Sequence, residues 1–241
     1  MHQEPTTRIS VFPIDTVNDR AGERGTETRS FFARTDVPMR APVACAPTLP
    51  AHFTPSSVSS EGIDAQVSIV ATLGEPLVEK GGQDWDRIGD AVHVYLGLPL
   101  AALPEGARLA AAEKILARLD AAGILSVEVL IELGWRWTEW IGAKFPGAEV
   151  VTESPIAWRN DDVQVMQGWI DARILLPNGE HILVDHKSYP GADPIGHIRD
   201  SYLGQLSVYS QALQTTHGTP PQQVLIHLPL LGAVAEVQLA A

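Results

Sequence analysis

The chain contains 241 residues, 45% of them hydrophobic, and its 29 acidic against 17 basic residues give a formal net charge of −12 at pH 7. This length predicts one compact domain, or a domain with an arm, and the apolar content is ample for a core. The single cysteine, Cys45, excludes an internal disulfide bond, no window is apolar enough to span a membrane, and residues 1–30 lack the apolar stretch of a signal peptide, so we expect a cytoplasmic protein.

The first part of the chain predicts an irregular N-terminal arm. Residues 1–65 are rich in Pro, Thr, Ser and Arg and show little periodicity apart from residues 9–14, where one strand is expected. Residues 66–241 are expected to form the folded domain. It begins with a short strand over residues 67–73 and a loop over residues 80–84.

Three helices are predicted next, each from an apolar face with helical spacing. They cover residues 84–97, 106–121 and 126–143, and Gly97 is expected to end the first of them. The third helix carries three tryptophans, for which core packing is the simplest interpretation. Contact with a missing domain and stacking on nucleic-acid bases are the alternatives. These residues are Trp135, Trp137 and Trp140.

The remaining elements predict a mixed sheet. Apolar, β-branched runs bounded by turn residues indicate strands, and a helix over residues 198–215 interrupts them. Helices, a central hairpin, a further helix and two final strands are typical of an α/β sandwich. The predicted strands cover residues 147–153, 155–159, 164–176, 181–188, 222–230 and 233–239.

The two central strands form a predicted β-hairpin whose register follows from its turn. Pro177, Asn178 and Gly179 suit the successive positions of a type I turn followed by a left-handed residue, the usual three-residue hairpin loop. This turn places Asp171 directly opposite Asp185, with Cα atoms roughly 4.5–5.5 Å apart. A slip of one residue would break the arrangement.

This hairpin brings together the groups that metal-dependent cleavage of a phosphodiester needs. Strand side chains alternate, so Asp171, Asp185 and Lys187 share one face while His186 points to the other. Mg²⁺ and Mn²⁺ prefer carboxylate oxygens together with water and phosphate, and a lysine can position water or stabilise charge on phosphorus. A simple ion pair on an exposed strand is the alternative. The apolar runs before each aspartate instead favour the ends of buried strands, where charges are more often functional.

Four motifs in this order resemble a known family. Residues 168–171 (G-W-I-D), 184–187 (V-D-H-K) and 205–209 (Q-L-S-V-Y) are similar to motifs of the PD-(D/E)xK superfamily, specifically the RecB-type nuclease domain. Residues 89–93 (G-D-A-V-H) resemble the G-x-x-x-H helix of the same family. The sequence of residues 184–191 most closely resembles the C-terminal nuclease domain of AddA-like, UvrD-type helicase–nucleases. The resemblance implies a restriction-endonuclease-like core.

The resemblance also implies a set of metal ligands. Asp171 and Asp185 would bind the ion, and His93 would complete the set. The backbone carbonyl of His186 would be an additional ligand. The family has a tyrosine where this chain has His186, a position whose side chain points away from the metal. Without the family context, His93 is equally well explained as a packed or solvated helical residue.

Four further residues take family roles in catalysis. Lys187 would be the catalytic lysine. Gln205 and Tyr209 lie four residues apart on one helix face and correspond to family residues near the active site and the DNA strand, although both could merely cap the edge of the core. Glu153 occupies the place of a glutamate that often precedes the hairpin, with a surface strand residue as the alternative.

The implied activity is that of a Mg²⁺- or Mn²⁺-dependent DNA exonuclease with one or two ions. It would hydrolyse single strands delivered by a helicase motor in the same polypeptide or complex, with an AddB-like subunit as a further partner, in double-strand-break repair and recombination. The chain lacks a G-x-x-x-x-G-K-[ST] loop and so is not itself the ATP-driven motor. With one cysteine it also lacks the four-cysteine iron–sulfur cluster of some relatives.

The net charge of −12 is unusual for a nucleic-acid enzyme, because phosphate binding normally relies on basic surface. A partner module with a basic channel would resolve the conflict. The main alternative is a catalytically silent nuclease-fold module for DNA binding or for scaffolding of a helicase complex. A stand-alone endonuclease is a third interpretation.

Overall fold

The structure, a computed structural model, describes residues 50–77 and 84–240. The strand expected over residues 9–14, and the predicted loop except for Asp84, lie outside the described residues. The helices are α1 (Trp85–Leu96), α2 (Glu105–Arg118), α3 (Val127–Lys144), α4 (Pro194–Ser201) and α5 (Leu203–His217). The strands are β1 (His52–Phe53), β2 (Ala65–Thr72), β3 (Glu149–Arg159), β4 (Val165–Leu175), β5 (His181–His186), β6 (Gln223–Leu228) and β7 (Ala233–Leu239).

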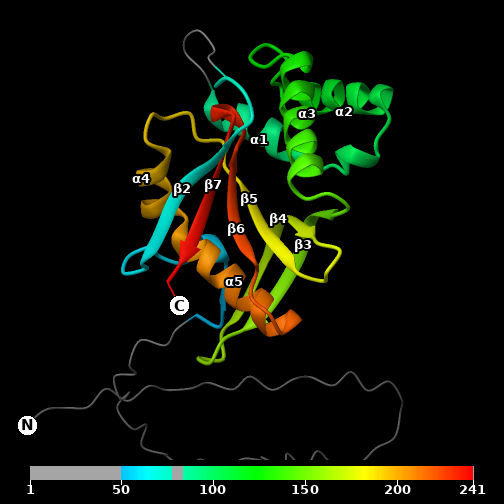
Figure 1. Cartoon of the computed structure of the whole chain (residues 1–241). Coiled ribbons are helices and arrows are strands. Elements are labelled where there is room, and N and C mark those ends of the chain that lie inside the picture. Colours follow the sequence, from blue (N-terminus) through cyan, green and yellow to red (C-terminus); the bar gives the residue numbers. More distant parts are fainter. Residues whose placement is uncertain (1–49, 78–83, 241) are drawn as a thin grey trace, which may run out of the picture. The chain divides into compact units, whose positions relative to one another are not determined.

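The strands form one mixed sheet. Its order is β1-β4-β5-β6-β7-β2, and β3 pairs with β4 off this path. The β5–β6 pair is parallel, whereas β3–β4, β4–β5, β6–β7 and β2–β7 are antiparallel. Helices cover both faces (Figure 1). The predicted fold class, a restriction-endonuclease-like α/β core with a mixed central sheet flanked by helices, is confirmed.

Two apolar clusters hold the helices on the sheet, and β5 contributes to both. Ile182 and Val184 pack with residues of α1, α2 and α3, whereas Leu183 packs with residues of α4 and α5. The alternation along β5 follows from the two-residue period of a strand. Every residue of β5 is buried, so the motif that ends this strand lies deep between the two helical layers.

The predicted hairpin register is confirmed. Ala172 pairs with Val184 and Leu175 with His181, which is the register that sets Asp171 against Asp185. Gly179 has φ +87°, and its N–H donates to the carbonyl of Leu176 at 2.9 Å. The left-handed conformation expected of this glycine therefore closes the turn.

Two predicted elements differ from the structure, and one predicted helix end is confirmed. One continuous strand, β3, replaces the two expected over residues 147–159, because pairing with β4 keeps the same register on both sides of Glu153. Two helices, α4 and α5, replace the one expected over residues 198–215, since Tyr202 (φ −121°, ψ −10°) interrupts the helical backbone. Gly97 ends α1 as predicted, but with right-handed dihedrals (φ −66°), so its conformational freedom is not used there.

Residues 50–64, which were expected to belong to the irregular arm, pack on the sheet. Strand β1 pairs in parallel with the start of β4. A short 3₁₀ helix, η1 (Pro55–Ser57), follows and contacts α5. A Cβ on Gly204 would overlap the carbonyl oxygen of Val58, so the absent side chain allows this close approach. The segment thereby fixes the start of α5.

Candidate active site

Strands β4 and β5 separate at the two motif aspartates. The last ladder pair between them is Ala172 with Val184, one step before Asp171 and Asp185. Beyond that point the Oδ2 atom of Asp171 accepts a hydrogen bond from the backbone N–H of His186 at 2.7 Å. A carboxylate thus continues the connection between the strands where the backbone ladder ends.

Helix α1 brings His93 to this point. A Cβ on Gly89 would lie 3.1 Å from the Cβ of Ser188, so the glycine lets α1 approach the segment after β5 closely. His93 follows one turn later on the same helix face. Its Nε2 atom lies 3.4 Å from Oε1 of Glu153, and its Nδ1 atom lies 3.8 Å from Oδ2 of Asp171.

Glu153 reaches His93 through an unusual backbone conformation. It has φ +48° within β3, at the position opposite Asp171. A non-glycine residue in the left-handed region costs about 1–2 kcal/mol, and such strain concentrates at functional sites. A Cβ on Gly97 would lie 3.0 Å from Oε1 of Glu153, so this glycine makes room for the carboxylate.

His93, Glu153 and Asp171 form a group with the spacing of metal ligands. One ligand atom from each lies within 4.8 Å of the other two. Two carboxylates and an imidazole suit Mn²⁺, and Mg²⁺ accepts the carboxylates together with water and phosphate. The sequence placed His93 and Asp171 in the metal set and Glu153 among the catalytic residues; in the structure the glutamate lies nearest the imidazole.

Asp185 lies beside this group and is already held by two side chains. Gln205 Nε2 donates to Oδ1 at 2.8 Å, and the ammonium of Lys187 lies 2.8 Å from Oδ2. The ammonium occupies one side of the buried Oδ2, and a carboxylate oxygen has two lone pairs, so one of them stays free. A buried carboxylate oxygen with a free lone pair fits an additional cation contact.

Burial and mutual attraction shift the pKa values of Asp171, Asp185 and Lys187. Burial raises the pKa of Asp185 to about 6, an effect that Lys187 opposes and the Asp171 carboxylate reinforces. Burial alone would lower the pKa of Lys187, but attraction to Asp185 outweighs it and raises that pKa. Burial also raises the pKa of Asp171, against the attraction of His93 and the hydrogen bond from His186. Lys187 therefore stays protonated, and both aspartates gain from a nearby cation.

The His186 side chain points to the opposite face, as predicted. Its ring lies edge-on to Trp137 of α3, with centroids 5.2 Å apart, and its Nδ1 lies 3.0 Å from Nδ1 of His227. The ring of His227 stacks on Trp137 at 4.3 Å. The backbone N–H of His186 binds Asp171, and metal binding by its carbonyl stays a prediction.

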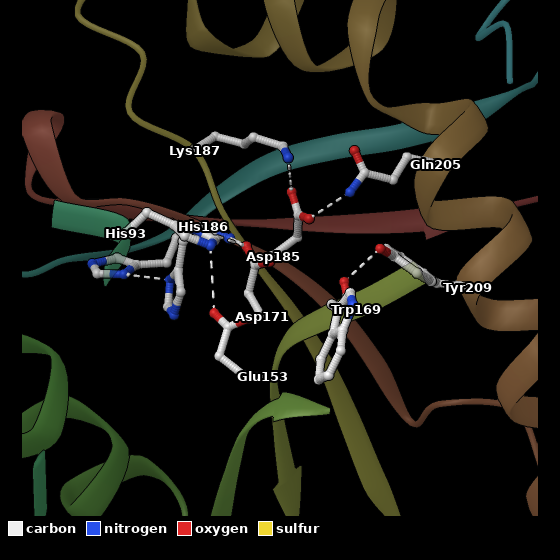
Figure 2. Close-up of polar contacts among 10 residues, drawn as sticks. His93, Glu153, Trp169, Asp171, Asp185, His186, Lys187, Gln205 and Tyr209 are labelled. Atoms are coloured by element: carbon white, nitrogen blue, oxygen red, sulfur yellow. Dashed lines mark hydrogen bonds and ion pairs between the residues drawn. The ribbon is translucent and has the colours of Figure 1, made fainter. Parts of the chain in front are cut away.

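Gln205 and Tyr209 share one face of α5 and serve different partners (Figure 2). Gln205 binds Asp185, whereas the Tyr209 hydroxyl donates to the backbone carbonyl of Trp169 at 2.6 Å. A Cβ on Gly168 would lie 3.2 Å from the Tyr209 hydroxyl and 2.9 Å from Cγ of Pro55. The first glycine of the G-W-I-D motif thus admits both the tyrosine and η1.

The tryptophans divide between core and surface. Trp137 is buried and Trp140 half-buried, which agrees with core packing, whereas Trp135 is half exposed. The apolar run before Asp171 was expected to be buried. Ile170 is buried, but Trp169 is 60% exposed, because none of the described helices covers the face of the sheet that it occupies at this position.

Two residues near the site were not singled out from the sequence. The Tyr202 ring lies 4.8 Å below the ammonium of Lys187, and His227 is the partner of His186. Tyr202 stands where α4 and α5 meet, a break that the continuous helical periodicity concealed. His227 lies on β6, whose parallel pairing with β5 has no local signal in the sequence.

Comparisons with known proteins give little guidance. No protein-family profile and no curated protein matches the chain. A solved structure titled "Crystal structure of SSO0001" aligns with 61% of this chain and 63% of its own, at 15% identity and a TM-score of 0.28. This chain therefore spans less than two thirds of that protein. Among the described residues, no helix has the length and apolar character needed to cross a membrane.

Proposed function

We propose that the chain is a metal-dependent deoxyribonuclease, acting as the exonuclease domain of a cytoplasmic ATP-dependent helicase–nuclease. One observation carries the proposal: His93, Glu153 and Asp171 have metal-ligand spacing beside the ion pair of buried Asp185 with Lys187, whose Nζ–Oδ2 distance is 2.8 Å. A hydrolase for phosphodiesters needs this combination of carboxylates and a cation. A purely structural role does not require these charges together.

Each residue of the site would have its own role in hydrolysis. A Mg²⁺ or Mn²⁺ ion would be held by His93, Glu153 and Asp171, together with the free lone pair on Oδ2 of Asp185. The ion would polarise a phosphoryl oxygen and acidify a water molecule. Lys187 keeps its proton on Nζ and offers positive charge to a phosphoryl oxygen. Gln205 keeps Asp185 oriented through its hydrogen bond to Oδ1.

The partners follow from the family resemblance and from the charge. A net charge of −12 gives little electrostatic attraction for DNA. A helicase motor in the same polypeptide or complex, together with an AddB-like subunit, would supply the basic channel and deliver single strands. The process served would be double-strand-break repair and recombination.

The proposal is tested by degradation of end-labelled single-stranded DNA in Mn²⁺, Mg²⁺ or EDTA. Wild-type protein should cut only with metal, and Lys187→Ala should abolish cutting. Lys114→Ala, which removes an exposed lysine from α2, is the matched control and should cut normally. Cleavage that persists in EDTA or in folded Lys187→Ala protein would refute the assignment.

A silent nuclease-fold module is the second candidate. The observation that favours it is the state of Asp185, whose two oxygens already face Gln205 and Lys187. Such a module would bind metal by calorimetry yet cut no DNA, even when a helicase motor is fused upstream. Gain of cutting upon fusion would instead show that the nuclease requires its motor.

A further inference from the structure

The position of Trp169 leads us to infer a role in substrate binding: its indole is a stacking platform for an unpaired base of single-stranded DNA, next to the candidate metal site. The inference rests on the proposed nuclease function and names the form of DNA that the site accepts. Trp169 is 60% exposed, unusual for a tryptophan within a sheet strand. Within residues 50–77 and 84–240, neither the core nor an interaction of the indole accounts for its presence there.

The backbone of Trp169 is fixed although its side chain is exposed. Its carbonyl accepts the Tyr209 hydroxyl at 2.6 Å, and the residue pairs with Pro155 of β3. The preceding Gly168 is packed against η1 and Tyr209. A ring on a fixed backbone has only its two side-chain torsions left to order when a ligand binds, which suits a binding platform.

The indole lies next to the candidate metal ligands. Trp169 is two residues before Asp171 on β4, and Glu153 lies opposite Asp171 on β3. Ile170 packs in the cluster with α5, so the adjacent indole leaves the other face of the sheet, on which α1, the helix of His93, packs. In Figure 2 the Trp169 indole points away from Lys187 and Gln205.

This face of the hairpin is open to solvent beyond the metal ligands. Alternate residues of β3 and β4 are exposed there, while those between them are partly or fully buried. In Figure 1 this part of β3 and β4 extends away from α3. The exposed residues are Pro155, Ala157, Arg159, Gln167 and Trp169. A strand of nucleic acid can therefore lie along a surface that the described part of the chain leaves open and that leads to Asp171.

An unpaired base is the ligand that this surface favours. The face offers a π-surface but only one cationic residue, Arg159, among its exposed residues. Binding along it cannot depend mainly on phosphate contacts. Stacking on an aromatic ring is independent of base identity and supplies much of the affinity for single strands. In a duplex the faces of the bases are already stacked, so the platform selects single-stranded DNA.

The test compares Trp169→Ala with Trp169→Phe and with Trp135→Ala. Trp135 is the matched control, since it is 50% exposed but belongs to α3. Affinity for a fluorescent single-stranded oligonucleotide is measured by anisotropy in Mn²⁺, separately from cleavage. Trp169→Ala should weaken binding about 5- to 100-fold, Trp169→Phe should restore most of the affinity, and Trp135→Ala should bind as wild type.

A second arm locates the stacked base. Single abasic positions are moved along the oligonucleotide, and one of them should weaken binding to wild type but leave binding to Trp169→Ala unchanged. Equal affinity of wild type and Trp169→Ala overturns the inference even if the protein cuts DNA. Binding that depends on Trp169 without any cutting would sustain the platform and refute the nuclease, whereas absence of binding by wild type would overturn the platform.

Discussion

The backbone N–H of His186 donates to the Asp171 carboxylate at 2.7 Å, so one motif of the chain directly holds the other. The contact spans the position where β4 and β5 separate. It orients one Asp171 oxygen, which also faces Nδ1 of His93 at 3.8 Å. Asp171 is therefore both a structural link and a candidate ligand.

Metal binding should stabilise the fold through Glu153 and His93. A cation present at 100 times its Kd adds about 2.7 kcal/mol to the free energy of unfolding. This raises the unfolding midpoint by roughly 5–10 °C in a domain of this size. Glu153→Gln should lose most of the shift that Mn²⁺ produces, as should His93→Gln. Differential scanning calorimetry in Mn²⁺ and in EDTA measures this shift of the unfolding midpoint. The control Glu113→Gln, on the exposed surface of α2, should keep the full shift.

Removal of the Gln205 amide should destabilise the fold. The buried Oδ1 of Asp185 would lose its 2.8 Å donor, and an unsatisfied buried acceptor costs about 1–3 kcal/mol. Urea unfolding of Gln205→Ala measures this loss. Gln211→Ala removes an amide of the same helix that reaches only Ser207 on the exposed side, and it should change stability by less than about 0.5 kcal/mol.

A methyl group on Gly168 should be poorly tolerated. It would lie 2.9 Å from Pro55 and 3.2 Å from the Tyr209 hydroxyl, and such overpacking costs about 1–3 kcal/mol. Gly106→Ala on α2 meets nothing within 4 Å and should be neutral or stabilising, because alanine favours a helix. Equal unfolding midpoints for both variants would show that η1 and Tyr209 do not pack tightly on the motif.

Protonation of His227 should oppose folding in acid. Burial lowers the pKa of His227 from 6.5 to about 3 in the folded protein. Between these values the unfolded chain binds the extra proton, so the free energy of unfolding falls as pH falls, by up to about 1.4 kcal/mol per unit. This stability is complete above pH 6.5 and is lost progressively toward pH 3.

The His227 contribution is measured as a difference, because Asp185 acts in the opposite direction. The raised pKa of Asp185, about 6, makes the native state bind the extra proton between pH 3.8 and 6, so this group favours folding as the pH falls. Urea unfolding of wild type and His227→Gln at pH 7.5 and pH 5 isolates the histidine. Stability of the variant should fall less between the two values; an equal fall would exclude His227 as the cause.

Much of the site could be predicted because its signals are local. The turn at Gly179 set the register of β4 and β5, and strand alternation placed His186 away from Lys187. The exposure of Trp169 could not be read from composition, since it depends on where the helices over that face end. The position of Glu153 next to His93 depends on a left-handed backbone within a strand, which no propensity favours for glutamate.

Residues 50–64 have a consequence for how the protein folds. The N–H of Gly204 at the start of α5 bonds to Ser60, 144 residues earlier in the chain. Contacts of such sequence separation are slow to form, because a long loop must close before they contribute. Helix α5, and with it Gln205 and Tyr209, therefore reaches its place only after the two ends of the domain have met. Assembly of the site should be among the last events of folding.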